Sequence, residues 1–191
     1  MNKEEQIKII NETIAKTKFT LKPLGYNFIF WGFLIISMSL FHYFFPEIVQ
    51  FNVYSAVIYW VLIPLLGMIY TTYYNIKTGK TIGYETILGR VIKIIWGVFG
   101  GSWIAIVTIS FYLETYDNPA QDILFLLGVT LTMSGLIIKF NKITLGGISL
   151  ILFVIYTYFV PDLNFLLVNV VGITFGMLLP GFALYFYKEN E

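Results

Sequence analysis

The sequence lacks cysteine entirely, contains a single histidine and is poor in charged residues. The absence of cysteine excludes disulfides, thiol chemistry and a cysteine-based metal site. Only 12% of the 191 residues are charged and 58% are hydrophobic, whereas a soluble domain typically has about 25% charged residues. This composition indicates a chain that resides in a membrane.

The apolar residues are grouped into long runs, as in membrane-spanning helices. A helix needs about 20 mostly apolar residues to cross the hydrocarbon core. Six segments meet this requirement, at residues 26–45, 53–74, 90–113, 122–138, 143–160 and 163–187. The sequence therefore predicts an all-α polytopic membrane protein, whose transmembrane domain (residues 23–191) has six helices arranged as three in-out-in hairpins.

The basic residues fall on one predicted side of the membrane. All 12 Lys and Arg lie in the N-terminal segment, around the second gap between spans, in the fourth gap or in the tail, and the other gaps carry only acids. Lys and Arg in short loops favour the cytoplasmic side. We therefore expect both termini in the cytoplasm, with the chain in the bacterial inner membrane and the lipid bilayer as its partner.

The N-terminal segment (residues 1–22) is predicted to be a separate amphipathic helix. Ile7, Ile10, Ile14 and Leu21 recur at helical spacing, with Lys and Glu on the opposite face. Such a helix can lie on the inner leaflet or dock on the bundle, and pairing with another protein is an open alternative. Pro23 is predicted to end this helix before the first span.

Two predicted hairpins are similar in sequence. Gly32 and Pro46 flank "GFLIISMSLFHYFFP", and Gly147 and Pro161 flank "GISLILFVIYTYFVP" with the same spacing. The likeness favours internal duplication, although apolar sequences also resemble one another by chance. In this alignment His42 corresponds to Thr157.

Small residues and prolines predict how the spans pack. GxxxG patterns occur at Gly97-Gly101 and Gly172-Gly176, and such patterns allow close helix approach. We expect packing within the chain, with a dimer face or a pore lining as the alternative. Internal prolines at Pro64 and Pro180 remove helical hydrogen bonds, which predicts kinks.

Candidate polar residues are few. No Asp, Glu, Lys or Arg lies well inside a predicted span, which counts against proton-coupled and most ion-coupled transport. The remaining candidates are His42, Asn169, Ser102 and Thr108. His42 is interpreted as an interfacial or hydrogen-bonded structural histidine, with an external pH-responsive site as the alternative. For Asn169, a packing hydrogen bond is preferred over a substrate contact.

Catalytic and metal sites are not predicted. Glu114, Asp117 and Asp122 could bind an external cation, but Asn118-Pro119-Ala120-Gln121 is typical of a capped helix start. We favour the capping interpretation. The sequence predicts no catalytic residues, no cofactor, no metal and no nucleic-acid partner.

Three segments together resemble a known family: "YNFIFWGFLIISMSLFHYFF", "SGLIIKFNKITLGGISLI" and "LLPGFALYFYKE". They are similar to a family of uncharacterised small bacterial six-span membrane proteins. The family's pattern is matched by Trp31, Gly32, Lys139, Phe140 and the Gly146-Gly147 pair. A more distant likeness, in architecture alone, is to the HdeD-like acid-resistance membrane proteins. Neither resemblance implies an activity.

Two functional hypotheses follow. The first is a non-enzymatic inner-membrane protein with a scaffolding, accessory or stress-related role, in which a homo-oligomer or a membrane-protein partner is conceivable. The second is a small transporter or channel for a neutral or apolar solute, built around the prolines, with a water-accessible cavity near Asn169, Ser102 and Thr108. A membrane enzyme is the least favoured alternative, because the sequence offers no combination of residues typical of a catalytic site.

Overall fold

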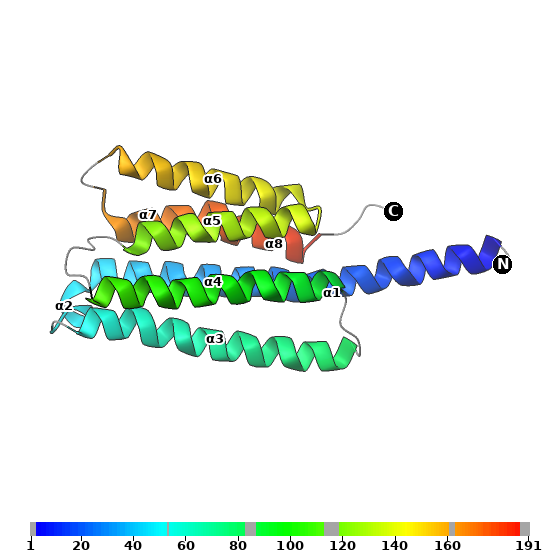
Figure 1. Ribbon diagram of the computed structural model, residues 1–191, viewed down its shortest axis with the longest axis horizontal. Coiled ribbons are helices and arrows are strands. Elements are labelled where there is room, and N and C mark those ends of the chain that lie inside the picture. The colour runs from blue at the N-terminus through cyan, green and yellow to red at the C-terminus, as the bar shows by residue number, and fades with distance from the viewer. Residues whose placement is uncertain (1–2, 53, 83–86, 113–118, 161–162, 188–191) are drawn as a thin grey trace.

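The computed structural model describes residues 3–52, 54–82, 87–112, 119–160 and 163–187. Within these ranges the regular secondary structure is helical throughout (Figure 1). The elements are α1 (Lys3–Phe44), α2 (Pro46–Val49), α3 (Ser55–Ile82), α4 (Ile87–Tyr112), α5 (Pro119–Ile137), α6 (Asn141–Tyr158), α7 (Phe165–Ile173), the π-helical segment η1 (Thr174–Leu178) and α8 (Leu179–Tyr185).

Six helices are long and apolar enough to cross a membrane. They cover Lys22–Phe44, Ser55–Gly79, Leu88–Tyr112, Pro119–Ile137, Asn141–Tyr158 and Phe165–Tyr185. The predicted spans agree with these ranges to within a few residues at most ends. Apolar composition over about 20 residues is therefore sufficient to locate the long helices of this chain.

The prediction that Pro23 ends the first helix is wrong. Helix α1 runs without interruption from Lys3 to Phe44 with Pro23 inside it. Proline removes one backbone hydrogen bond and crowds the preceding turn, but Gly25, two residues later, packs on α8, where an added Cβ would lie 2.9 Å from the Tyr185 nitrogen. The N-terminal part of α1 projects past the other helices as a continuation of the first span (Figure 1).

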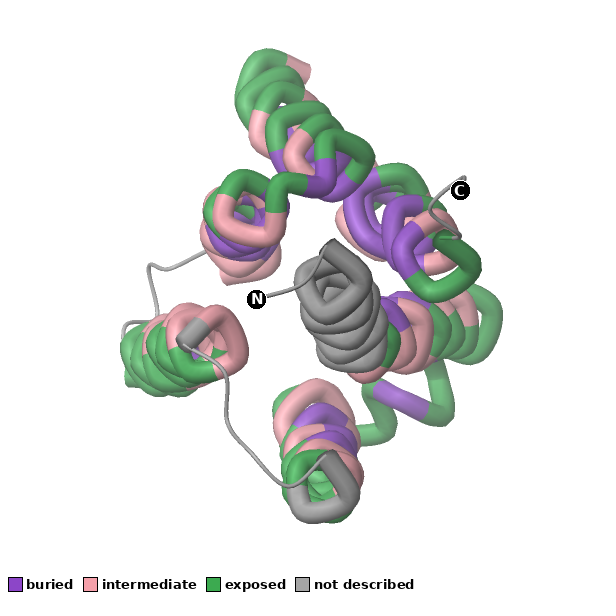
Figure 2. Tube along the Cα trace, turned by 90° about the vertical axis from the view of Figure 1, so that its right-hand side faces the viewer, coloured by how far each residue is buried: buried purple, intermediate pink, exposed green. Residues whose placement is uncertain are grey.

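The best-packed part of the molecule is built by α1, α5, α6, α7, η1 and α8. Its fully buried apolar side chains include Phe28, Leu131, Ile143, Leu150 and Ile173. An end-on view shows the largest block of buried positions on the C-terminal helices themselves, on the sides that face their neighbours (Figure 2). Helices α3 and α4 lie outside this block and expose most of their apolar side chains.

Helices α5 and α6 form the closest pair, and glycine makes their approach possible. A Cβ added to Gly147 would lie 2.5 Å from the Thr132 nitrogen and 2.7 Å from the Gly128 carbonyl oxygen. The turn between the two helices is a Schellman motif. Phe140 N–H donates to the Gly135 carbonyl at 2.9 Å, and Lys139 N–H donates to the Leu136 carbonyl at 3.3 Å.

The two GxxxG patterns behave differently. Added Cβ atoms at Gly172 and Gly176 would lie 2.9 Å and 3.0 Å from Leu150 of α6, so this pattern serves packing within the chain as predicted. Added Cβ atoms at Gly97 and Gly101 of α4 would meet nothing within 4 Å. Among the described residues, the prediction of close packing within the chain is therefore wrong for Gly97 and Gly101, although α4 itself packs on α5.

The two internal prolines differ in their surroundings. The sixth span is irregular before Pro180, whereas α3 is a regular α-helix around Pro64. Proline has no N–H to donate to the carbonyl four residues earlier, and η1 occupies the turn before Pro180, with Leu179 N–H bonded to the Thr174 carbonyl. This π-helical turn is a local irregularity of the kind that accompanies kinks, and the kinks at Pro64 and Pro180 themselves stay predictions. Helix α3, in contrast, continues as α-helix from Ser55 to Ile82.

Candidate functional site

His42 is the centre of a small polar cluster at one end of α1. Its side chain is only 7% exposed, so it is buried under its neighbours. Trp60 of α3 donates its indole N–H to His42 Nδ1 at 3.0 Å. The Gln50 side-chain amide lies 2.7 Å from His42 Nε2. The histidine thus connects α1 with α3 and with the residue that follows α2.

The bonding partners fix the tautomer of a neutral His42. An indole can only donate a hydrogen bond, so His42 Nδ1 must accept and carries no hydrogen. The hydrogen then resides on Nε2, which can only donate. The Gln50 atom at 2.7 Å from Nε2 is the amide nitrogen, also a donor, so the hydrogen bond requires the Gln50 amide turned by 180°, with its oxygen towards the ring. Both ring nitrogens are used inside the chain. This geometry agrees with a hydrogen-bonded structural histidine.

Protonation of His42 would change this cluster. A charged ring carries hydrogens on both nitrogens, so Nδ1 could no longer accept from Trp60. The pH-responsive interpretation therefore has a definite structural meaning, namely the loss of the Trp60–His42 hydrogen bond, which is one of several contacts between α1 and α3.

Thr157, which corresponds to His42 in the sequence alignment, has a similar environment. It is buried and accepts a hydrogen bond from the side-chain amide of Gln121 at 3.1 Å. A glutamine side chain on another segment thus bonds to each of the two aligned positions. Helix α5 begins at Pro119 as expected, but the Gln121 amide is directed to Thr157, and the proposed cap residue Asn118 lies outside the described residues.

The other predicted candidates do not form a common site. Asn169 is buried on α7, which packs on α1. Ser102 is half-buried on α4, and Thr108 on the same helix is exposed. The Thr108 hydroxyl donates to the Ile104 carbonyl of its own helix at 2.8 Å. Within the described residues α4 packs mainly on α5, whereas the helix that carries Asn169 packs on α1. The cavity shared by these three residues stays a prediction.

A second polar cluster, at the opposite end of the bundle, was not predicted. The Asn27 amide donates to Asn75 Oδ1 at 3.0 Å, and the Tyr26 and Tyr70 hydroxyls lie 2.7 Å apart. Both contacts join α1 to α3. The available signal was the presence of asparagines near the facing ends of two successive spans, which a helix hairpin brings to the same depth.

Three buried polar atoms have no hydrogen-bond partner among the described residues: Asn27 Oδ1, Ser39 Oγ and Trp96 Nε1. They belong to α1 and α4. No group of three or more His, Asp or Glu side chains that could hold a metal ion occurs in the part of the chain that the structure describes. The visible polar chemistry consists of contacts between helices.

Six long apolar helices and helix-joining polar contacts indicate an integral membrane protein of the all-α class. Comparison of the chain with family models, with curated proteins and with solved structures finds no match. The resemblance to the small six-span family accordingly stays a prediction based on the motifs quoted above.

Proposed function

We propose that this chain is a non-enzymatic protein of the bacterial inner membrane with a scaffolding, accessory or stress-related role. In this proposal the six spans form three in-out-in hairpins, and the basic ends of the helices and both termini face the cytoplasm. The resemblance to small bacterial six-span proteins belongs to the same proposal.

The observation that carries the proposal is the exposure of α4. Only 6% of its most apolar stretch is buried, against 44% for the spans at Pro119–Ile137 and Phe165–Tyr185. Exposed apolar side chains on this helix include Ile94, Val98 and Ile104. A span with so little packing inside its own chain offers a face for another membrane protein or a second copy, with lipid contact as the alternative.

The geometry of Gly97 and Gly101 supports association over simple lipid contact. Both are exposed and have free space around the position of a Cβ. Helix association in lipid depends on close approach at small residues, whereas lipid chains have no such requirement. A scaffolding or accessory role needs a surface of this kind.

The test uses the natural absence of cysteine. A single Val98→Cys substitution should give disulfide cross-links in native membranes, to a second copy or to another protein. Adding Gly97→Leu and Gly101→Leu should abolish the cross-link because the bulky side chains separate the helices. Gly79→Leu is the matched control, since Gly79 also has nothing within 4 Å of an added Cβ but lies on α3. Cross-linking that persists in the Gly97/Gly101 variant, or is never seen, would contradict the proposal.

A second candidate function is a small transporter or channel for a neutral solute. The π-helical turn before Pro180 favours it, because π-helical turns are frequent at functional sites. Solute flux into liposomes that contain the purified protein would support this function. Single cysteines at Asn169, Ser102 and Thr108 that resist water-soluble thiol reagents in every state would contradict it.

A further inference from the structure

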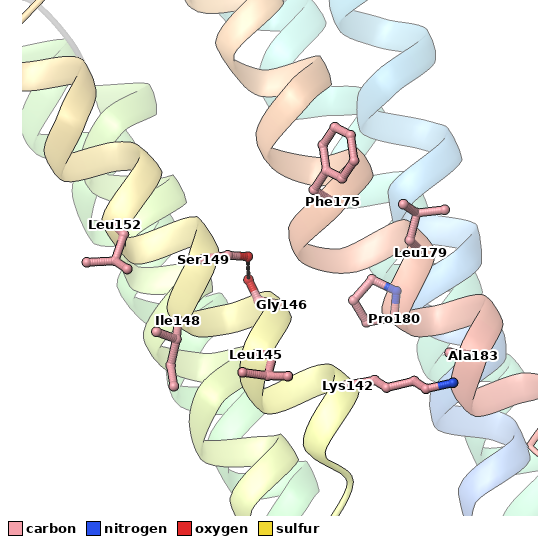
Figure 3. Close-up of a pocket in the computed structure, with 10 residues that line it drawn as sticks. All are labelled: Lys142, Leu145, Gly146, Ile148, Ser149, Leu152, Phe175, Leu179, Pro180 and Ala183. Atoms are coloured by element: carbon pink, nitrogen blue, oxygen red, sulfur yellow. Dashed lines mark hydrogen bonds between the residues drawn. The ribbon is translucent and has the colours of Figure 1, made fainter.

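An apolar groove runs between α6 and the η1–α8 segment on the outside of the bundle (Figure 3). Its volume is about 740 Å³, which is in the range of small-molecule sites. The residues that the argument uses are Lys142, Ser149 and Leu152 of α6, Phe175 of η1, and Leu179 and Ala183 of α8. Leu152, Phe175 and Leu179 are each at least 50% exposed, so the groove opens towards the surroundings of the bundle.

The floor of the groove is the contact between the two helices. A Cβ added to Gly146 would lie 2.6 Å from the Gly176 carbonyl oxygen and 2.7 Å from Pro180 Cγ. At this close approach the backbones meet, and the larger side chains on either side form the walls. Because the contact involves backbone and a proline ring, the shape of the groove is fixed by the fold.

Polar groups are distributed unevenly along the groove. The Ser149 hydroxyl donates to the Gly146 carbonyl at 2.9 Å, so its hydrogen is already used inside α6. Among the described residues that line the groove, Lys142 alone is charged; it lies at one end and extends towards Ala183 across the groove (Figure 3). The groove is therefore an apolar channel with a cation at one end, which is complementary to an amphiphile with an anionic headgroup.

The length of the groove matches one leaflet. From Lys142 to Leu152 the helix rises about 15 Å, at about 1.5 Å per residue. Half of a hydrocarbon core of about 30 Å is the same distance. An acyl chain that starts at the level of Lys142 would follow the groove to the middle of the bilayer.

We propose that this groove binds an anionic phospholipid of the inner leaflet. The phosphate is held by Lys142, and one acyl chain lies between α6 and the η1–α8 segment. The choice of leaflet rests on the proposed orientation, in which the turn before α6 is cytoplasmic. Lys139, which lies in that turn, adds a second positive charge at the same end.

The first test measures lipid binding by native mass spectrometry of the delipidated full chain in micelles, with phosphatidylglycerol and phosphatidylethanolamine as probes. Lys142→Gln should weaken phosphatidylglycerol binding about fivefold, as expected for one lysine near an anionic surface, with phosphatidylethanolamine little changed. Lys22→Gln is the matched control, because Lys22 is an exposed lysine on α1. An equal loss in both variants would overturn the proposal.

The second test fills the groove. Ser149→Trp should reduce binding of both lipids because the indole occupies the path of the acyl chain. Ile155→Trp is the control on the same helix, because Ile155 is exposed and outside the lining. Binding that is unchanged in Ser149→Trp, or equally reduced in Ile155→Trp, would overturn the groove as the site.

The leaflet is tested separately. Lys142→Cys in intact cells should resist an impermeant maleimide and react after the membrane is permeabilised. Labelling from outside would overturn both the inner-leaflet assignment and the proposed topology. If the unsubstituted chain shows no preference for phosphatidylglycerol in micelles, the lipid site alone is overturned, so the two failures are distinguishable.

Discussion

At the scale of single residues, the bond between His42 and Trp60 links two spans. Trp60→Phe removes the donor and leaves His42 Nδ1 buried without its partner. An unsatisfied buried polar atom costs about 1–3 kcal/mol, so we expect a loss of this size in the free energy of unfolding. His42→Phe should have a comparable effect, because it leaves the indole N–H unpaired. Titration with a denaturant in micelles gives the free energy of unfolding of each variant and so measures both losses.

The double variant His42→Phe/Trp60→Phe distinguishes a direct bond from two independent effects. It should lose less stability than the sum of the single variants, since neither unpaired group remains. Tyr43→Phe is the control, because Tyr43 is exposed beside His42. Fully additive losses would contradict the hydrogen bond.

Lys139 is the one described non-glycine residue with positive φ, at 55°. It occupies the position of the Schellman turn that glycine usually fills, because a side chain is disfavoured in the left-handed region. Lys139→Gly should therefore raise the free energy of unfolding by about 1 kcal/mol. The control Lys142→Gly, inside α6, should lower it. If Lys139→Gly is less stable than the parent, the side chain of Lys139 stabilises the fold by more than its left-handed backbone costs, which would contradict the prediction.

At the scale of helices, the close approach of α5 and α6 depends on Gly147. Gly147→Ala places a Cβ against the backbone of Thr132, so the helices must separate. Overpacking of this kind costs about 1–3 kcal/mol, measured as a lower midpoint of thermal unfolding in micelles. The control is Gly101→Ala, where the added Cβ meets nothing within 4 Å. Equal effects in the two variants would contradict the difference between these helix faces.

The sequence predicts helices better than the contacts between them. The spans follow from apolar length, which is a local property. The continuation of α1 through Pro23 is not local, because the residues after the proline are held by α8. The surroundings of the GxxxG patterns are not local either. Gly97 and Gly101 repeat the pattern of Gly172 and Gly176, but among the described residues only the second pair packs against another helix.

For the candidate site, too, the sequence predicts the residue but not its contacts. The sequence identifies His42 as the one histidine, but its partner Trp60 is 18 positions away and its partner Gln50 is 8 away. Asn27 and Asn75 are 48 positions apart. Which polar residues meet depends on how the helices rotate about their axes, and apolar runs with small hydrophobic asymmetry contain little information about rotation.

At the scale of the whole molecule, the orientation can be tested directly. Phe51→Cys lies between α2 and α3, and Asn141→Cys lies at the start of α6. In intact cells an impermeant maleimide should label only Phe51→Cys, because the proposed orientation places the basic end of the bundle in the cytoplasm. Permeabilised cells provide the control in which both react. Labelling of Asn141→Cys alone would reverse the proposed topology.

The uneven core divides the molecule into a packed part and a peripheral part. Helices α5 to α8 with α1 bury the apolar side chains, whereas α3 is joined to α1 by the two polar clusters near its ends. Helix α4 adds few buried residues of its own. The peripheral helices are the part of the fold whose position another molecule could change at the lowest cost.

The length of α1 has a consequence outside the membrane. Its 42 residues rise about 63 Å at about 1.5 Å per residue. A bilayer with its headgroups is about 40–45 Å thick, so an upright α1 extends about 20 Å into the aqueous phase beyond the lipid. In that position the first turns of α1 would serve as a spacer arm, and a molecule bound there would be held above the membrane surface at a distance set by the number of helical turns.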